Sequence, residues 1–264
     1  MLNNIMIGQY FPGNSVLHRL DARVKLALMA ALMVGVFFCD NGASYGLFIL
    51  LAVILTKVSG VSTRVVLRSL MPLRWIVLLT FLIHLFSAPG EKIFEFYMLS
   101  ATEEGFWRGL FIGFRLMLLI LFSSLLTFTT EPMVLTDALQ YLMSPLKKIG
   151  VPAAEIAMMM TVALRFVPTL INEADKIIKA QKSRGADFEE GSLLTRIKNL
   201  TPILVPLFIS CFRRADELAL AMEARCYTGE KERTHLKELK TTAIDAKAAA
   251  MAAAFLGVVF WMQQ

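Results

Sequence analysis

The sequence predicts an all-α integral membrane protein with about five transmembrane helices and a cytoplasmic bundle of amphipathic helices between the fourth and the fifth. Hydrophobic residues make up 56% of the 264 residues and charged residues only 18%, whereas a soluble domain is about 45–50% apolar and about 25% charged. The mean hydropathy is +0.61. The apolar residues form runs that one charged stretch interrupts. We therefore expect an N-terminal membrane domain of four spans, a cytoplasmic domain and a C-terminal transmembrane helix, at residues 1–130, 131–240 and 241–264.

The first two spans are short apolar runs separated by a turn. Residues 24–38 and 43–58 are apolar, and Asp40-Asn41-Gly42 lies between them. Asp-Asn-Gly is a strong turn signal, and an aspartate in the middle of the bilayer would cost a few kcal/mol. We therefore expect two helices rather than one long helix. Each is shorter than the ~20 residues that a hydrocarbon core requires, so flanking residues or local thinning must supply the rest.

Three further apolar runs complete the predicted spans, at residues 70–88, 106–130 and 241–261. A glycine recurs every fourth residue where the fourth span begins, at Gly105, Gly109 and Gly113. Small residues at this spacing let two helices approach closely. We expect this glycine face to pack inside the protein, and contact with a partner protein is the alternative.

The distribution of charge predicts the orientation in the membrane. Basic residues precede the first span and separate the second from the third: Arg19, Arg23, Lys25, Lys57, Arg64, Arg68 and Arg74. The loop after the third span carries four glutamates instead. A net charge of +6 can indicate nucleic acid binding, but an excess of Lys and Arg in cytoplasmic loops explains it without a nucleic acid partner. The N-terminus is therefore expected in the cytoplasm, and four crossings return the chain there near Glu131.

Residues 131–240 are expected to remain in the cytoplasm, because their charges come too often for lipid-spanning segments. Their apolar positions recur at helical spacing, which predicts amphipathic helices that pack on one another and on the membrane face. Residues 151–171 and 200–212 are nevertheless apolar enough to be spans by hydropathy alone. The second of these contains Pro202 and Pro206, which favour a kinked or broken helix. The number of spans near these two segments stays open on the sequence alone.

No pattern typical of a catalytic or metal site occurs in the chain. The phosphate-binding pattern GxxxxGK[ST] and the zinc-binding pattern HExxH are absent, and the three cysteines lie far apart. Ionisable residues inside the predicted spans are few, among them His84 and Arg115, whereas an ion-coupled carrier usually needs more. We therefore expect a non-catalytic protein without a cofactor or metal of its own. A self-contained secondary carrier or channel is the alternative.

Two segments of the cytoplasmic stretch end in the same way. In each, an Ala-Asp pair is followed nine residues later by an arginine between two small residues. The two ends are Ser183-Arg184-Gly185 and Ala224-Arg225-Cys226. The helix dipole favours an arginine near a helix C-terminus by about 0.3–1 kcal/mol, which explains one such end. Two of them favour docking, because a guanidinium without bulky neighbours can enter a groove and pair with a carboxylate or a carbonyl.

Several segments together resemble a known family over nearly the whole chain. They are Pro12-Gly13-Asn14-Ser15, residues 18–26, Arg165-Phe166-Val167-Pro168, residues 180–185 and residues 221–225. In these segments the chain resembles the transmembrane T component of energy-coupling factor (ECF) transporters. The resemblance implies that the two arginine ends dock into grooves of two ATP-binding cassette (ABC) ATPase subunits. Cys226 departs from the family pattern, in which Gly or Ser is more usual, but it is also small.

The resemblance further implies the function of the chain. It would be a non-catalytic scaffold subunit of an ATP-driven importer of a vitamin or other micronutrient, in the cell membrane of a prokaryote. The partner ATPases would use ATP and Mg, and their motion would pass to a membrane S component that binds the substrate and topples to release it. Four methionines are candidates for contact with the S component, because methionine adapts to different surfaces: Met143, Met158, Met159 and Met160. Internal packing of these methionines is the alternative. The identity of the substrate depends on chains other than this one.

Overall fold

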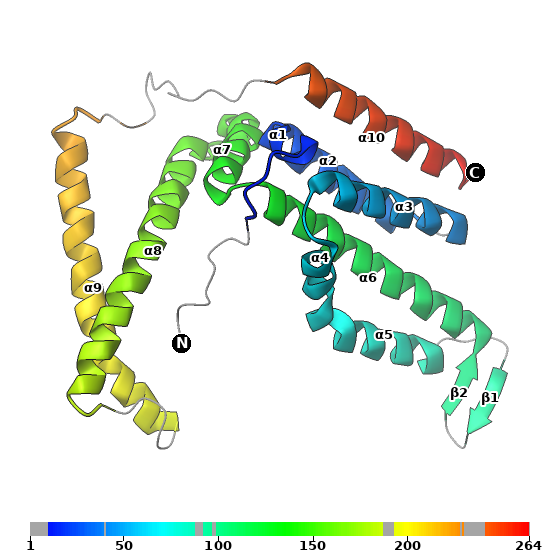
Figure 1. Cartoon of the computed structure of the whole chain (residues 1–264), viewed down its shortest axis with the longest axis horizontal. Helices are drawn as coiled ribbons and strands as arrows, with labels where there is room; N and C mark the ends of the chain where they lie inside the picture. The colour runs from blue at the N-terminus through cyan, green and yellow to red at the C-terminus, as the bar shows by residue number, and fades with distance from the viewer. Residues whose placement is uncertain are drawn as a thin grey trace. The chain divides into compact units, whose positions relative to one another are not determined.

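The computed structural model describes residues 10–39, 41–87, 92–96, 99–186, 193–227, 229 and 241–263. Its elements in chain order (Figure 1) are α1 (Val16–Arg19), α2 (Ala22–Phe37), α3 (Gly42–Ser59), α4 (Thr63–Leu70), the 3₁₀ turn η2 (Met71–Leu73), α5 (Arg74–Ser87), β1 (Lys92–Phe96), β2 (Leu99–Thr102), α6 (Glu103–Thr129), α7 (Pro132–Met143), the 3₁₀ segment η3 (Ser144–Ile149), α8 (Ala153–Ser183), α9 (Leu193–Glu223) and α10 (Ala243–Trp261). The predicted all-α membrane fold is confirmed. The strands found within the described ranges, β1 and β2, form one short antiparallel pair between α5 and α6.

Five helical segments of the described chain are long and apolar enough to cross a membrane, which agrees with the predicted number. They are Gly42–Ser59, Thr63–Ser87, Glu103–Thr129, Ala153–Ser183 and Ala243–Trp261. The set differs from the expected one, because α2 has only 16 residues and α8 qualifies in its place. Length and composition do not by themselves place a helix in the bilayer. The cytoplasmic location of α8 therefore stays a prediction.

The connections around α3 differ in part from the sequence-based expectation. The predicted turn between the first two spans is consistent with the end of α2 at Phe37 and the start of α3 at Gly42, while Asp40 lies outside the described residues. The basic segment before the third span was expected to be a loop, but α4 occupies most of it. Pro72 explains why α4 and α5 are separate helices, since proline lacks an N–H and its ring clashes with the preceding turn.

The chain divides into two compact units, and the boundary falls within α7. The membrane unit comprises Gly8–Ala138 with Glu238–Gln264, and the hairpin unit contains Leu139–Lys237. The first holds α1 to α6, the start of α7 and α10, whereas the second holds the rest of α7, η3, α8 and α9.

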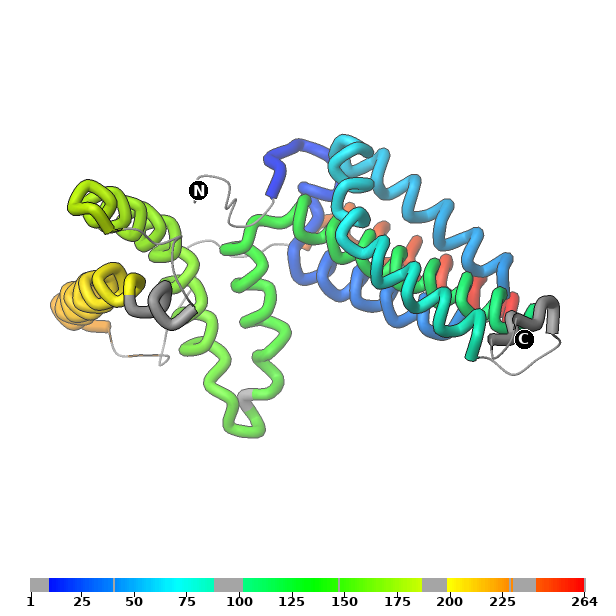
Figure 2. The backbone as a smooth tube through the Cα atoms, turned by 90° about the horizontal axis from the view of Figure 1, so that it is seen from below, coloured from blue at the N-terminus to red at the C-terminus, as the bar shows by residue number. Residues whose placement is uncertain are grey.

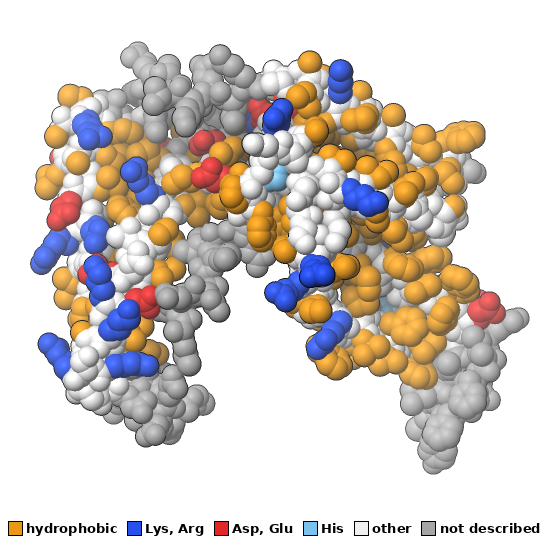
Figure 3. All heavy atoms as spheres, viewed as in Figure 1, with side chains coloured by type: hydrophobic (Ala, Val, Ile, Leu, Met, Phe, Trp, Pro, Cys, Tyr) orange, Lys and Arg blue, Asp and Glu red, His pale blue; other side chains and the backbone are white. Residues whose placement is uncertain are grey.

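Helix α6 is the centre of the membrane unit, because it contacts α2, α3, α4 and α5. Helix α10 packs against α2, and the helices run alongside one another (Figure 2). Phe48 of α3 and Phe122 of α6 are both 0% exposed. The Phe48 ring makes edge-to-face contacts with Phe122 and with Phe255 of α10, at centroid distances of 6.3 and 5.1 Å. Many hydrophobic side chains also cover the visible outer surface of this unit (Figure 3), as expected for a surface that faces lipid.

The glycine face of α6 packs inside the membrane unit, as predicted, and its partner is α5. A Cβ atom on Gly105 would lie 2.5 Å from the backbone oxygen of His84. Equivalent atoms on Gly109 and Gly113 would lie 3.1 Å from Phe81 and 3.3 Å from Val77. Only glycine therefore allows α5 and α6 to approach this closely at Gly105.

The hairpin unit is built on two 31-residue helices, α8 and α9, which pack against each other. The sequence favoured a kinked or broken helix near Pro202 and Pro206. The structure agrees with the kinked alternative, because one helix continues through both prolines and bends in its N-terminal part (Figure 1). The two prolines therefore bend α9 without ending it.

Candidate functional site

The first arginine end is a helix C-terminus closed by a left-handed glycine. Gly185 has a φ of +84°, and its N–H donates to the carbonyl of Lys182 at 3.0 Å. The N–H of Ala186 donates to the carbonyl of Gln181 at 3.0 Å. These two hydrogen bonds define a Schellman motif. Arg184 is the C-cap residue of α8, so its side chain leaves the helix where the backbone reverses direction.

The second arginine end repeats this geometry with a cysteine. Cys226 has a φ of +55° and is the only non-glycine residue of the described chain with a positive φ. Its N–H donates to the carbonyl of Glu223 at 2.9 Å, and the N–H of Tyr227 donates to the carbonyl of Met222 at 3.1 Å. Arg225 therefore occupies the same capping position as the arginine that ends α8. The similarity seen in the sequence reflects one backbone motif used twice.

Both arginines are exposed, as are the small residues on either side of them. Within the part of the chain that the structure describes, neither the Arg184 nor the Arg225 guanidinium has a hydrogen-bond or ion-pair partner. A guanidinium presents five N–H donors in a rigid fork. The two ends therefore offer unpaired, bidentate cations on rigid helix termini.

The two ends lie at opposite ends of an antiparallel helix pair. Arg214 of α9 pairs with Glu173 of α8 at 3.4 Å, and the Tyr227 hydroxyl donates to the sulfur of Met158 at 3.5 Å. Tyr227, which follows the second arginine end, is thus beside the N-terminal part of α8. The 26 residue steps from Met158 to Arg184 cover about 40 Å at 1.5 Å per residue. The two arginine ends are therefore well separated along the helix pair.

The ends differ in charge although their backbones match. Exposed lysines precede Arg184 on α8, at Lys176, Lys179 and Lys182. Exposed glutamates precede Arg225 on α9, at Glu217 and Glu223. Basic side chains of α8 and α9 gather on the visible face of the hairpin unit (Figure 3). One end is thus strongly basic, whereas the other is close to neutral.

Comparison with known proteins identifies the family to which this chain belongs. The family model described as "CbiQ: Cobalt transport protein" matches residues 13–236. A relative from Acidaminococcus fermentans, "Energy-coupling factor transporter transmembrane protein EcfT", is 52% identical over 246 residues, which are 93% of this chain and 92% of the relative. The chain belongs to the EcfT family. Proteins with the same name from Ruminiclostridium cellulolyticum and Bacillus subtilis are 47% and 41% identical, over 100% of this chain and 98% and 100% of theirs.

Membership of the EcfT family confirms the predicted function in its main terms. The chain is the transmembrane component of an energy-coupling factor transporter, a multi-pass membrane protein and a non-catalytic transporter subunit. No group of three or more His, Cys, Asp or Glu side chains within the searched, described residues could hold a metal ion.

The four candidate methionines of the EcfT-family chain are not equivalent. Met159 and Met160 are 62% and 40% exposed. Met158 is partly buried and accepts the hydrogen bond from Tyr227, which gives it a packing role between α8 and the end of α9. Met143 is partly buried at the end of α7. Only two of the four thus present an open apolar surface.

A larger apolar surface lies on α9, and the sequence analysis did not identify it. Its members recur at the three- and four-residue spacing of one helix face, and all are exposed: Leu204, Val205, Phe208, Ile209 and Phe212. Further along α9, Cys211, Arg214 and Leu218 line a groove together with Phe166 of α8. The helical spacing of this apolar stripe is visible in the sequence. The two prolines obscured it, because they favoured a kinked or broken helix over one continuous face.

Proposed function

We propose that the two arginine ends are the docking points of the chain for two ABC-type ATPase subunits. Each ATPase would receive one helix end, with Arg184 in one groove and Arg225 in the other. The observation that carries the proposal is the repeated Schellman motif with an exposed, unpaired arginine at its C-cap. Its occurrence at both ends of one antiparallel pair favours two separate partners over one.

The chemistry of the two ends fits insertion into a groove. The left-handed turn directs the chain away immediately after the arginine, and the flanking Ser, Gly, Ala and Cys side chains add little bulk. The guanidinium can then form two parallel hydrogen bonds with a carboxylate or with backbone carbonyls of the ATPase. Removing one partner of such a buried, charged pair usually costs about 3–5 kcal/mol, so each arginine would be essential for its contact.

Movement of the ATPases would reach the transported substrate through the hairpin unit. When ATP and Mg bind, the two ATPase subunits close, and the docked ends of α8 and α9 move with them. A membrane S component that binds a vitamin or other micronutrient would contact the apolar stripe on α9 together with Met159 and Met160. Such coupling requires an element with two states that both partners bias, and the hairpin unit would be that element.

The distribution of Lys and Arg supports one orientation of the chain in the membrane. The chain would lie in the cell membrane of a prokaryote, with its N-terminus and hairpin unit in the cytoplasm, because the basic residues flank the cytoplasmic side of the spans. Helix α8 would then lie at the membrane face rather than across it. Its C-terminal half carries Lys176, Lys179 and Lys182, which are costly in a hydrocarbon core and favourable near anionic headgroups.

Reversal of both docking charges tests the proposal. We expect Arg184→Glu with Arg225→Glu to abolish co-purification of the ATPase subunits and ATP-dependent uptake. Arg213→Glu is the matched control, because Arg213 is an exposed arginine of α9 that lies within the helix and not at its end. The proposal is wrong if the double variant still captures its ATPases and supports uptake.

A further inference from the structure

The C-terminus of α6 is closed by groups from the N-terminal segment of the chain. The Lys25 ammonium donates to the carbonyl of Thr129 at 3.0 Å and to the hydroxyl of Thr130 at 3.1 Å. The N–H of Phe11 donates to the carbonyl of Phe128 at 3.0 Å. The last carbonyls of a helix have no partner within the helix, so these contacts satisfy two of the four. Lys25 is 2% exposed, which makes it a buried cation rather than a surface one.

A buried carboxylate balances the charge of Lys25 and brings a third helix to the same point. Asp245 of α10 is 2% exposed and interacts electrostatically with Lys25. It accepts hydrogen bonds from the N–H of Asp21 at 2.8 Å and from the N–H and hydroxyl of Thr242 at 2.6 and 2.8 Å. The starts of α2 and α10 and the end of α6 thus meet in one buried polar cluster.

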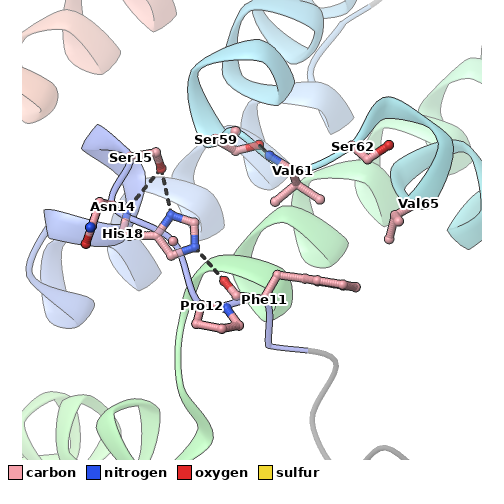
Figure 4. A pocket seen from close by; sticks show the side chains of 11 residues that line it. Phe11, Pro12, Asn14, Ser15, His18, Ser59, Val61, Ser62 and Val65 are labelled. Atoms are coloured by element: carbon pink, nitrogen blue, oxygen red, sulfur yellow. Dashed lines mark hydrogen bonds between the residues drawn. The ribbon is translucent and has the colours of Figure 1, made fainter.

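The segment before α2 is itself held in shape by His18. The ring Nε2 donates to the carbonyl of Phe11 at 2.9 Å, and the Ser15 hydroxyl lies 2.7 Å from Nδ1 (Figure 4). A Cβ atom on Gly13 would lie 2.9 Å from the His18 ring, so a side chain there would displace the ring. The rings of Phe11 and Phe128 meet edge to face at 5.6 Å. These contacts place the Phe11 N–H against the end of α6.

The other end of the α2–α6 pair has a reciprocal contact. Arg115 of α6 donates to the carbonyl of Cys39, just after α2, at 3.0 Å, and its guanidinium lies 5.7 Å from the centroid of the Phe37 ring. Each helix therefore provides a cation that binds a backbone carbonyl at, or just beyond, the C-terminus of the other. The two contacts are alike in chemistry, but only the Lys25 contact lies where the chain continues into α7.

We propose that Lys25 is a positioning residue for coupling, because it fixes the last turn of α6 at the junction with α7. This inference rests on the proposed function. Helix α7 begins at Pro132, and the boundary between the membrane and hairpin units falls inside it. A helix end without partners frays, and a frayed α6 would absorb movement of the hairpin unit. With Lys25 in place, the end of α6 stays fixed, and movement of the hairpin unit changes the orientation of α7 relative to α6.

The test separates assembly from coupling. Lys25→Met with Asp245→Asn removes both charges of this pair, so that neither is left buried without the other. We expect this variant to capture the ATPases and to hydrolyse ATP at a rate close to that of the unaltered complex. We expect its uptake per assembled complex to fall about tenfold, because charged hydrogen bonds at the junction are lost. Lys25→Arg keeps a cation there and should retain most of the uptake.

Arg115→Met is the matched control, since it removes the same kind of contact at the far end of the same helix pair. It should lower thermal stability but leave uptake per assembled complex within about twofold. Equal loss of uptake in Arg115→Met, or normal uptake in the Lys25 and Asp245 variant, would overturn the inference.

If the Lys25 and Asp245 variant does not accumulate in cells, Thr130→Val provides the test, because it removes one acceptor of Lys25 without a change in charge. Reduced uptake with normal ATP hydrolysis then supports the inference, and unchanged uptake overturns it. Loss of the docking function would appear differently, as failure to capture the ATPases.

Discussion

Gly185 and Cys226 occupy the same position in the two helix ends, one residue after the exposed arginine, and both have a positive φ, 84° and 55°. The position therefore requires a residue that tolerates left-handed backbone, and not only a small one. Glycine meets this requirement without strain, whereas an L-residue such as cysteine costs about 1–2 kcal/mol. The sequence departure at Cys226 thus has a structural consequence.

Substitution at this shared position should act in opposite directions at the two ends. Cys226→Gly should stabilise the end of α9 by about 1 kcal/mol, because it relieves the left-handed strain. Gly185→Ala should destabilise the end of α8 by about the same amount. Hydrogen exchange of the amides of Tyr227 and Ala186 measures both effects, each expected to be about fivefold. Equal exchange rates before and after both substitutions would contradict the assignment of the motif.

Because the α8 end is basic and the α9 end is close to neutral, the docking contact of the α8 end should be more sensitive to acidic substitution than that of the α9 end. Lys179→Glu with Lys182→Glu should weaken the contact at the α8 end, because that groove meets a basic surface. Native mass spectrometry should then show the complex with one ATPase subunit instead of two. The loss should become smaller at high salt, since exposed charges are screened. Loss of both subunits together, or an effect independent of salt, would contradict separate grooves.

The close approach of α5 and α6 should make Gly105 intolerant of a side chain. Gly105→Ala places a methyl group 2.5 Å from the His84 backbone oxygen, so we expect a destabilisation of about 1–3 kcal/mol. Gly46→Ala in α3 is the matched control, because no atom lies within 4 Å of the added group. It should be neutral or stabilising by up to about 1 kcal/mol. Thermal unfolding in detergent compares the two, and equal melting temperatures would exclude this packing role for Gly105.

The apolar stripe on α9 should be needed for the S component but not for the ATPases. Phe208→Ser with Phe212→Ser removes its two aromatic members, which are 60% and 68% exposed. We expect co-purification of the S component to fall about tenfold or more, because truncated aromatic anchors cost about 2 kcal/mol or more. Leu220→Ser is the control, since Leu220 is an equally exposed residue of α9 outside the stripe, at 66%. Normal capture of the S component by the stripe variant would show that another surface binds it.

The sequence predicted those features that depend on local spacing. Apolar runs and the Asp-Asn-Gly turn predicted the separate helices α2 and α3, and the glycine spacing predicted close packing of α6. The repeated Ala-Asp…Arg pattern predicted two equivalent helix ends, because a Schellman motif is set by a few neighbouring residues.

The features that the sequence did not reveal depend on contacts between distant residues. The antiparallel register that separates Arg184 from Arg225 follows from the pairing of α8 with α9, which no local pattern specifies. Lys25 looked like one of several basic residues before the first span, yet it is buried because residues 104 and 220 positions away supply its partners. The two prolines inside α9 were ambiguous, since a proline can bend a helix without ending it.

Site-specific photocrosslinking measures the central claim most directly. A photoreactive amino acid in place of Ser183 or Ala224 lies beside each docking arginine, and the same group in place of Arg213 is the control within α9. We expect the first two positions to crosslink each to an ATPase subunit of the assembled transporter, and the control position to give no such product. Crosslinks of both positions to lipid or to the S component, with none to an ATPase, would contradict the docking role of the two helix ends.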